Sequence, residues 1–571
     1  MKQKENFGVL LKKMVSEWIW LFRYIKKYRL ITLLYVVIGL LSVAMSLGIS
    51  VVSKIVIDAV ISKENDTLLS FGVLVILLAV FQHVFQAVSS WIISVVSSKA
   101  NNEIRCEIYS HIVSAGWKDV SRYHTGELLN RLESDVASVS GGAISFIPGL
   151  IIKLCQFIGA LCIVLYHDPV MALLALMSAP FMFLSSKFIV RAMRKYNEKT
   201  RELNGKVLSY TQESVQNIQL IKAFDLTKDY INNFTKLLEE FRSFRLGYDK
   251  FSILMTLCLS LIGVAVSYSC YGLGIFRLWQ GAITFGTMTM FLQLSGVLTS
   301  SFSALVSMVP SAVSIATAAG RIIEVTSFPE EDDSDKEKAL AILRKSEKSG
   351  VYINFEKVAF RYDDAENEVL KNISLGIAPG DTIAFIGPSG EGKTTLLKLI
   401  LGIVKPTEGQ LYISSSDGDR VSISDSTRRF CSYVPQDMGI FSGTIADNLR
   451  LVKNDATDEE LMKVIETADL TAMINALPDG INTDVSESGN NFSQGQLQRI
   501  AIARALLRDS QIILMDEATS SLDVETETRV LNNIMVSSPE KICIITTHRE
   551  SMLKYCNRIY KVNSNGEMTE C

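Results

Sequence analysis

A glycine-containing loop between an apolar run and a helical pattern is the segment of this chain best suited to hold a phosphate. The sequence TIAFIGPSGEGKTTLLKLI, residues 382–400, indicates a strand, a loop and a helix in succession. Its loop has the spacing GxxxxGK[ST], in which backbone N–H groups and the helix dipole can attract a phosphate. Lys393 can reach phosphate oxygens, and Thr394 can ligate Mg²⁺. We expect a phosphate site formed by Gly387, Pro388, Ser389, Gly390, Glu391, Gly392, Lys393, Thr394 and Thr395.

An acidic pair follows a second apolar run and offers the groups that a phosphoryl-transfer site needs. The run Ile512–Leu514 is followed by Met515, Asp516 and Glu517. Asp516 at a strand end can hold Mg²⁺ through water, and Glu517 is placed to polarise an attacking water. Alone, two adjacent acids would more often cap the following helix. The phosphate loop in the same chain favours the catalytic interpretation.

The polar stretch NFSQGQLQR, residues 491–499, lies shortly before this acidic pair but contains no carboxylate or histidine. It therefore lacks the side chains that usually act as general acids and bases. A serine hydroxyl and backbone N–H groups at a helix N-terminus can instead stabilise the charge on a phosphate. We expect this stretch to bind and position rather than to transfer protons.

The composition indicates a large protein with a membrane part. Of 571 residues, 48% are hydrophobic and only 20% are charged, so we expect at least two domains, one of them in a membrane. The net charge of −3 gives no argument for nucleic-acid binding, and we expect no nucleic-acid partner. The nine cysteines form no CxxC pair, which argues against a structural zinc or a disulfide framework.

Six apolar segments are long enough to cross roughly 30 Å of hydrocarbon: 30–52, 69–92, 143–165, 170–190, 252–276 and 287–311. The connections 93–142 and 191–250 and the N-terminal segment are rich in Lys and Arg, whereas two of the outer loops, ISKENDT and YHDP, nearly lack them. The positive-inside rule therefore predicts that both termini are cytoplasmic. Several runs continue beyond the membrane as charged helix, so we expect long cytoplasmic extensions.

The sequence predicts three parts. Residues 1–325 form an all-α transmembrane domain, in which an interfacial helix containing Trp18–Tyr28 precedes six membrane helices. Residues 326–350 form a charged linker with proline and glycine near its ends. Residues 351–571 alternate β-branched runs with helical patterns and form an α/β domain. The fold class is thus a multidomain membrane protein with an α/β P-loop ATPase domain.

From about residue 351 to the end, the sequence resembles the nucleotide-binding domain of ATP-binding cassette (ABC) proteins. The six-helix portion before it resembles the exporter-type half-transporters. Six motifs carry the resemblance, in the family's order: FRYDDAENEVL, the phosphate loop, YVPQDMGIFSGTIADNL, ESGNNFSQGQLQRIAIARALL, ILMDEATSSLD and TTHRE. The resemblance covers nearly the whole chain and implies ATP and Mg²⁺ as cofactors.

The resemblance also implies a role for each matching residue. Tyr362 would stack on adenine, and Gln436 would contact Mg²⁺ and the attacking water. His548 would bond the γ-phosphate and hold the water with Glu517, while Asp523 would bridge two nucleotide domains. Taken singly, a tyrosine after a strand, a surface glutamine and a histidine at a strand end are more often structural.

NFSQGQLQR resembles the family signature, which closes over ATP held by the phosphate loop of a second domain. Ser493, Gln494, Gly495 and Gln496 would then face a γ-phosphate bound elsewhere. The commonest form of the signature reads Leu-Ser-Gly-Gly-Gln, so Gln494 is a departure. Two interpretations stay open: Gln494 is a tolerated substitution, or its amide adds a contact across the nucleotide sandwich.

Two competent sites require two such domains, so we expect a second half-transporter as partner. Two copies of this chain suffice, and a related partner chain is the alternative. The segments AGWKDVSRYHTGELLNRLESDV and NIQLIKAFDLTKDY resemble coupling segments that dock on nucleotide domains. Charged helical hairpins in water would have a similar composition.

Polar residues within the apolar segments are the only guide to the cargo: Gln82, His83, Gln86, Lys153, Gln156 and Gln293. They predict an amphiphilic or peptide-like substrate, although interhelical hydrogen bonding would explain the amides equally well. We expect ATP-driven efflux by alternating access across a bacterial inner membrane, with the nucleotide domain in the cytoplasm. A lipid flippase or a multidrug exporter of the same architecture is the alternative.

Overall fold

The computed structural model of the chain describes residues 7–571 with the exception of 124, 174–195, 197–198, 201, 333, 347–348, 363–366, 389 and 487–490. It divides into two compact units. The first contains residues 1–113 and 124–327, and the second contains residues 114–123 and 328–571. The second unit therefore includes a short segment from the N-terminal third of the chain, which the boundaries predicted from the sequence did not anticipate.

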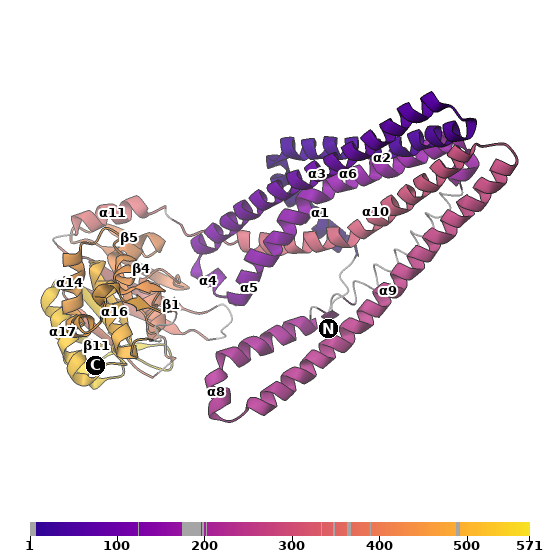
Figure 1. Cartoon of the computed structure of the whole chain (residues 1–571). Coiled ribbons are helices and arrows are strands. Elements are labelled where there is room, and N and C mark those ends of the chain that lie inside the picture. The colour runs from indigo at the N-terminus through magenta and orange to yellow at the C-terminus, as the bar shows by residue number, and fades with distance from the viewer. Residues whose placement is uncertain are drawn as a thin grey trace. The chain divides into compact units, whose positions relative to one another are not determined.

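The described part of the first unit is helical (Figure 1). A π-helical turn, Arg131–Asp135, joins α5 to α6. Residues 202–216 are also helical, and α8 lies at the turn between them and α9 (Figure 1). The helices are α1 (Phe7–Lys27), α2 (Arg29–Ser62), α3 (Asn65–Ser114), α5 (Thr125–Asn130), α6 (Val136–His167), α8 (Ile218–Ala223), α9 (Thr227–Trp279) and α10 (Phe285–Thr326).

Four helical stretches among the described residues are long and apolar enough to cross a membrane: Arg29–Ser62, Asn65–Ser114, Thr125–His167 and Phe285–Thr326. They contain four of the six predicted spans. The predicted span 252–276 lies inside α9, and 170–190 falls almost entirely outside the described residues. The 50 residues of α3 extend about 75 Å, more than twice the thickness of the hydrocarbon layer. Part of α3 therefore projects beyond the membrane, as its sequence predicts.

Helices α2, α6 and α10 form the packed centre of the first unit. Val43 and Leu47 of α2, Ala160 and Val164 of α6, and Leu294 of α10 are buried in one apolar cluster. Glycines allow the close approach: a Cβ on Gly39 would lie 2.3 Å from Ile152 Cδ1. Membrane helices commonly pack through such small residues, because lipid supplies no hydrophobic drive for their association.

Ion pairs hold the π-helical turn before α6 to the last turns of α10. Arg321 donates from Nε to Asp135 Oδ2 at 2.7 Å and from Nη2 to Asp135 Oδ1. Arg131 donates to Glu127 Oε1 at 2.8 Å and lies 3.0 Å from Glu324 Oε2. Asp135 and Arg131 are both buried. A buried charge is tolerated when it is paired in this way.

The second unit contains two main sheets. The four-stranded antiparallel sheet has the order β2-β1-β4-β5, and the six-stranded sheet has the order β12-β11-β3-β10-β9-β6 with only β12 antiparallel. A short pair, β7-β8, lies apart. The strands are β1 (Tyr352–Phe360), β2 (Leu370–Ile377), β3 (Thr382–Ile386), β4 (Glu408–Ser414), β5 (Arg420–Ser422), β6 (Cys431–Val434), β7 (Gly443–Thr444), β8 (Asp484–Val485), β9 (Ile512–Asp516), β10 (Ile542–Thr546), β11 (Arg558–Val562) and β12 (Met568–Glu570).

Both faces of the six-stranded sheet are covered. Ile512 and Leu514 of β9 join the core shared with the four-stranded sheet, whereas Ile513 and Met515 join the core under α16 and α17. This alternation follows from the two-residue period of a strand and explains why β9 is apolar throughout. The helices of this unit are α4 (Trp117–Val120), α11 (Lys336–Lys345), α12 (Lys393–Ile400), α13 (Ile445–Arg450), α14 (Asp458–Thr467), α15 (Thr471–Asn475), α16 (Gln494–Leu507), α17 (Val524–Ser537) and α18 (Glu550–Leu553).

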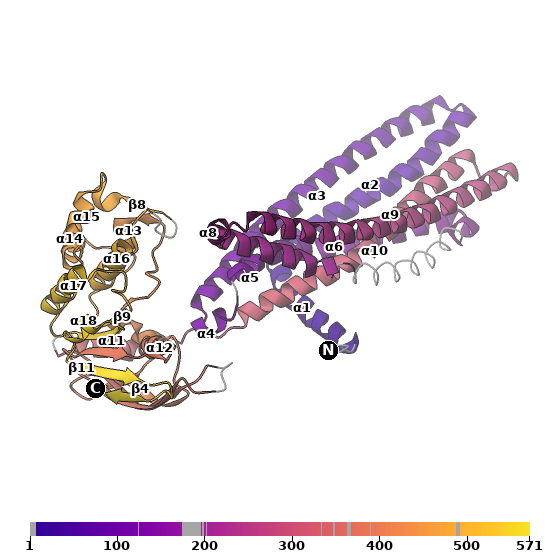
Figure 2. The ribbon, with the colours of Figure 1, turned by 90° about the horizontal axis from the view of Figure 1, so that it is seen from below.

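Within this unit, β4 and β11 lie at one end and α13, α14 and α15 at the other (Figure 2). The predicted charged linker 326–350 contains α11, whose Ala339 and Ile342 are buried in the same core as β1 and β2. The charged face that suggested a linker is therefore the solvent side of an amphipathic helix.

Candidate nucleotide site

Neighbouring parallel strands bring the predicted site residues to one edge of the six-stranded sheet. The phosphate loop follows β3, Gln436 follows β6, Glu517 follows β9 and His548 follows β10. Because the carboxyl ends of parallel strands meet at one edge, residues far apart in the sequence come together there.

The phosphate loop has backbone angles that favour glycine. Gly387, Gly390 and Gly392 have φ values of 144°, 91° and 99°. A Cβ on Gly387 would also lie 2.6 Å from the carbonyl oxygen of Val562. Glycine is therefore required at this position for both angle and space. Ser389 of the loop is outside the described residues.

Lys393 folds back onto the loop that it follows. Its Nζ donates to the carbonyl oxygens of Gly387 and Pro388, each at 2.7 Å, and the residue is 5% exposed. Burial lowers the pKa of Lys393, while the nearby Glu517, Glu391 and Asp516 oppose the shift. The ammonium group thus lies at the mouth of the loop, where phosphate oxygens could take the place of the carbonyls.

The side-chain oxygens of Thr394 and Asp516 lie together at the base of the loop and could act as metal ligands. Thr394 Oγ1 donates to Asp516 Oδ1 at 3.1 Å, and Thr546 Oγ1 donates to the same oxygen at 2.7 Å. Tyr433 donates its hydroxyl to Asp516 Oδ2 at 3.4 Å, and burial together with Asp516 raises the pKa of Tyr433. Mg²⁺ takes oxygen ligands of this kind, so the residues fit the predicted cation.

Glu517 lies at the centre of the three predicted catalytic residues. Gln436 donates from Nε2 to Glu517 Oε2 at 2.9 Å, and His548 Nε2 lies 3.0 Å from Glu517 Oε1. Glu517 has a φ of 49°, and its N–H donates to the carbonyl oxygen and the Oγ1 of Thr546. A left-handed residue that is not glycine costs about 1 kcal/mol or more and is common at functional sites.

Tyr362 lies beside the helix that begins at the phosphate loop. Its hydroxyl is 3.2 Å from Thr395 Oγ1, and its ring packs edge-on against Phe360 at a centroid distance of 4.8 Å. Glu391 of the loop has a buried Oε2 without a hydrogen-bond partner among the described atoms. The structure therefore brings both residues to the loop.

Ser493 begins α16 with a reciprocal cap. Its N–H donates to Gln496 Oε1 at 2.8 Å, and Gln496 N–H donates to Ser493 Oγ at 3.3 Å. This capping box fixes the helix N-terminus, where Ser493 is exposed and Gln496 is half-buried. A Cβ on Gly495 would lie 3.0 Å from the carbonyl oxygen of Ser521, so glycine allows the 520–522 loop to approach.

The structure also places the two remaining predicted residues. Gln494 Oε1 accepts a hydrogen bond from Ser521 Oγ at 3.4 Å, within its own domain. Asp523 caps α17 by accepting from Thr526 N–H at 2.9 Å, and this bond lowers the pKa of Asp523. Among the described residues, no hydrogen bond joins 493–496 to the phosphate loop of the same chain.

Sequence reasoning missed several residues that hold these groups in place. Gln498 is buried, donates to Ser520 Oγ at 3.1 Å and accepts from Ser521 N–H at 3.0 Å. Arg549 donates to the carbonyl oxygens of Ser520 and Leu522. Thr546 pairs with Asp516 in the β10–β9 register. Their one sequence signal is proximity to the motifs, since Gln498 lies one turn after Gln494 and Arg549 follows His548.

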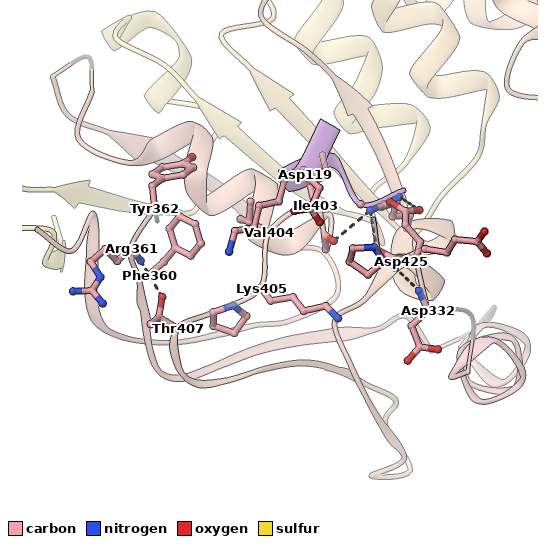
Figure 3. A pocket seen from close by; sticks show the side chains of 18 residues that line it. Asp119, Asp332, Phe360, Arg361, Tyr362, Ile403, Val404, Lys405, Thr407 and Asp425 are labelled. Atoms are coloured by element: carbon pink, nitrogen blue, oxygen red, sulfur yellow. Dashed lines mark hydrogen bonds and ion pairs between the residues drawn. The ribbon is translucent and has the colours of Figure 1, made fainter. Parts of the chain in front are cut away.

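The segment 114–123 contacts the rest of the second unit, hereafter the nucleotide unit. Lys398 of α12 places its Nζ 4.7 Å from the centre of the Trp117 ring, and Glu331 N–H donates to Ser114 O at 2.9 Å. A cavity of about 540 Å³ lies beside the segment, and Figure 3 shows Asp119, Tyr362 and Lys405 among its lining residues. The segment therefore touches the helix that begins at the phosphate loop.

Comparisons with known proteins cover both units. The family described as "ABC transporter transmembrane region" matches residues 31–302, and the family described as "ABC transporter" matches residues 370–520. A putative export ATP-binding/permease protein of Rickettsia typhi is 28% identical over 96% of this chain and 94% of its own length. A putative multidrug export ATP-binding/permease protein of Staphylococcus aureus is 27% identical, with coverage of 96% and 95%. A solved structure of a bacterial Atm1-family ABC exporter with ATP bound has a TM-score of 0.82 at 21% identity, with 95% of each chain covered.

Proposed function

This chain belongs to the ABC transporters as an exporter-type half-transporter that hydrolyses ATP, and from that premise we propose that two copies drive an amphiphilic or peptide-like substrate out of the cell. The proposed reaction is alternating access powered by ATP at two shared sites. The observation that carries it is the cluster of Gln436, Glu517 and His548 beside the phosphate loop. The membrane is proposed to be a bacterial inner membrane, with both termini and the nucleotide domain in the cytoplasm.

The hydrolytic step requires a base, a phosphate clamp and charge neutralisation. Glu517 would orient and polarise the attacking water, while Gln436 and His548 hold its carboxylate on two sides. Lys393 and the N–H groups of the loop would bind the β- and γ-phosphates, with Tyr362 against adenine. Thr394, Asp516 and Gln436 would hold Mg²⁺, which neutralises phosphate charge. Catalysis here depends on positioning, so most of its residues need not titrate.

A second nucleotide domain is proposed to complete each site. Ser493 and the N–H of Gly495 stand at an exposed helix N-terminus, which attracts anions. The same helix makes no hydrogen bond to its own phosphate loop among the described residues. The ligand of this N-terminus would therefore be the γ-phosphate bound by the partner. A homodimer suffices because one chain carries every element.

Two segments are proposed to transmit the change to the membrane helices. Trp117 of α4 lies over Lys398 of α12, so a shift of the phosphate-loop helix would reach the end of α3 directly. In α8, Ile218, Leu220 and the adjoining Phe224 are more than half exposed. These apolar side chains would dock on a nucleotide domain, which explains why they face outward in a single chain.

Polar side chains on the membrane helices support a cargo with polar groups. Gln82, His83 and Gln86 lie in α3, Lys153 and Gln156 in α6, and Gln293 in α10. Export of drugs, as named for the Staphylococcus aureus relatives, and lipid flipping use the same architecture. The lipid-flippase alternative predicts that a labelled lipid moves from one leaflet of the bilayer to the other, and measuring this movement distinguishes it from export.

Uptake into inside-out vesicles tests the proposal. ATP should drive accumulation of an amphiphile or peptide inside vesicles that contain this chain, and Glu517→Gln should abolish the accumulation while preserving ATP binding. Labelled phospholipid in the same vesicles reports flipping. The absence of Glu517-dependent hydrolysis and of any uptake would overturn the proposal.

A further inference from the structure

One basic residue, Lys153, lies near the middle of a predicted membrane span, and the six predicted spans contain no acid to balance it. The six predicted spans, 30–52, 69–92, 143–165, 170–190, 252–276 and 287–311, contain no Asp or Glu and only two lysines, Lys153 and Lys187. Lys187 is close to the predicted cytoplasmic end of its span, where a long side chain can reach water. Lys153 is close to the midpoint of 143–165, where a charge is costly unless it has water or a partner.

Lys153 belongs to the side of α6 that packs against α10. Gly149, one turn before it, is close enough to α10 that an added Cβ would lie 3.6 Å from Met308 Cε. Phe157, one turn after it, has its ring centre 6.1 Å from that of Phe302. The two helices lie side by side in both views (Figures 1 and 2). A residue between these contacts faces the interior of the helix bundle rather than lipid.

The contacts of Lys153 are neutral. Its Nζ donates to Gln156 Oε1 at 3.0 Å, and no ion pair to a carboxylate involves it among the described residues. An amide oxygen supplies a dipole but no opposite charge, so the ammonium keeps a net charge. Gln156 therefore orients the ammonium without neutralising it.

Within the predicted span 287–311, helix α10 adds hydroxyls but no negative charge. A row of its polar side chains is exposed at intervals of three, four or seven residues, which places them on one face of a membrane-embedded helix. A polar face is expected beside a wet cavity and is unusual against lipid. The row consists of Gln293, Ser300, Ser303, Ser307 and Ser311.

We propose that the exported substrate is an anionic amphiphile, a molecule that joins an apolar body to a carboxylate or phosphate group bound by Lys153. This inference rests on the proposed export function and adds the charge of the cargo. The substrate supplies the acidic group that the six predicted spans lack, and its anion replaces Gln156 as the partner of the Lys153 ammonium. A charge-assisted bond of this kind is stronger than the amide contact that it replaces. Cationic amphiphiles meet an uncompensated like charge at the same place.

Matched single-chain probes in vesicles of zwitterionic phosphatidylcholine test the proposal. Dodecyl phosphate and dodecanoate carry a negative charge, and dodecyltrimethylammonium carries a positive charge on the same apolar chain. The measurements are ATPase stimulation and ATP-dependent uptake. A labelled phosphatidylglycerol in a parallel set of vesicles shows whether the anion belongs to a membrane lipid or to a free amphiphile.

The anionic probes should stimulate the protein, and the cationic probe should not. Lys153→Gln should raise the half-stimulating concentration of dodecyl phosphate about tenfold or more, Lys153→Arg should retain the anionic preference, and Lys153→Glu should transfer it to the cationic probe. Lys236→Gln, an exposed lysine on the cytoplasmic part of α9, is the matched control and should behave like the unmodified chain.

Three results would overturn the inference: equal stimulation by the cationic probe, an unchanged response in Lys153→Gln, or no stimulation by either anionic probe. Failure of the export proposal looks different. In that case the anionic and cationic probes would both lack Glu517-dependent uptake. Glu517-dependent uptake of the cationic probe alone would support export and contradict the negative charge assigned to the substrate.

Discussion

The nucleotide unit and the first unit, hereafter the membrane unit, are each stabilised internally by a different kind of contact. Around Glu517 the contacts are short polar bonds, in which Gln436, His548 and Thr546 each hold one defined atom. Along α2, α6 and α10 the contacts are apolar and depend on glycines that let helices approach. Directional bonds specify which atom must be present, whereas apolar packing specifies mainly volume.

This difference explains why chemistry can be assigned to single residues in one unit more readily than in the other. Removing one atom from a polar cluster leaves its neighbours without partners. Exchanging one apolar side chain for another of similar volume usually costs less than about 1.5 kcal/mol. Substitutions in the two units should therefore differ in size and in what they disturb.

The largest effect is expected at Glu517. Glu517→Gln keeps the size of the side chain but removes the carboxylate that would polarise water, so ATP hydrolysis should fall about 10²- to 10⁴-fold. ATP binding should persist because Lys393 and the loop are unchanged. Steady-state ATPase assays and equilibrium nucleotide binding check this. Near-normal turnover would contradict the role given to Glu517.

The next largest effect concerns the exposed end of α16. Ser493→Arg should lower hydrolysis about a hundredfold, because the donor for the partner's phosphate is lost. Lys393→Ala should instead abolish ATP binding itself. Nucleotide binding measured without Mg²⁺ separates the two variants. If Ser493→Arg impaired binding as much as Lys393→Ala, the shared-site arrangement would have to be abandoned.

In the membrane unit, whose packing is otherwise mainly apolar, the largest single effect is expected at the buried carboxylate Asp135. Asp135→Asn leaves the Arg321 guanidinium, which is 37% exposed, without its carboxylate and should destabilise the unit by about 1.5 to 3 kcal/mol. Thermal unfolding in nanodiscs measures the change. Lys206→Gln, which removes an exposed partner of Glu202, should leave the unfolding temperature unchanged. Equal effects of the two variants would remove the distinction between buried and exposed pairs.

A smaller effect is expected at Gly495. Gly495→Ala would put a Cβ 3.0 Å from Ser521 O, so the 520–522 loop must shift, at a cost of about 1 to 2 kcal/mol. The shift should also slow hydrolysis, because this loop precedes Asp523. Thermal unfolding and ATPase rates should change together in this variant. An increase in stability without loss of rate would show that the loop has room.

The smallest effect is expected at Gln494. Its bond to Ser521 is long and exposed, so Gln494→Gly should change stability by about 1 kcal/mol or less and leave the ATPase rate and ATP affinity nearly unaltered. Gln498→Ala in the same assays should have a larger effect, because Gln498 is buried and makes two hydrogen bonds to the same loop. A large loss of ATP affinity in Gln494→Gly would favour a contact across the nucleotide sandwich.

The fold class and the family predicted from the sequence are confirmed, because local pattern determines both. The strand, loop and helix around Lys393 are adjacent in sequence, and their spacing alone indicates a phosphate loop. Apolar runs likewise report membrane helices without knowledge of their neighbours. The roles of the individual site residues stay predictions, and the assays above test them.

The features that could not be predicted depend on pairing between distant segments. Thr546 meets Asp516 because β10 lies in register beside β9, and no local pattern encodes that register. Gln498 acquires its partners from the approach of the 520–522 loop. The helix α11 was missed because its charged residues outweigh the two apolar side chains that it buries.

The membership of residues 114–123 in the second unit has a consequence for biosynthesis. Ser114 accepts a hydrogen bond from Glu331, which is translated roughly two hundred residues later. At about 5 to 20 residues per second, α4 must wait for ten seconds or more before its binding surface on α12 has been made. A ribosome that stalls before residue 400 would leave Trp117 without its neighbour Lys398, and such a chain presents an exposed aromatic side chain to chaperones and proteases.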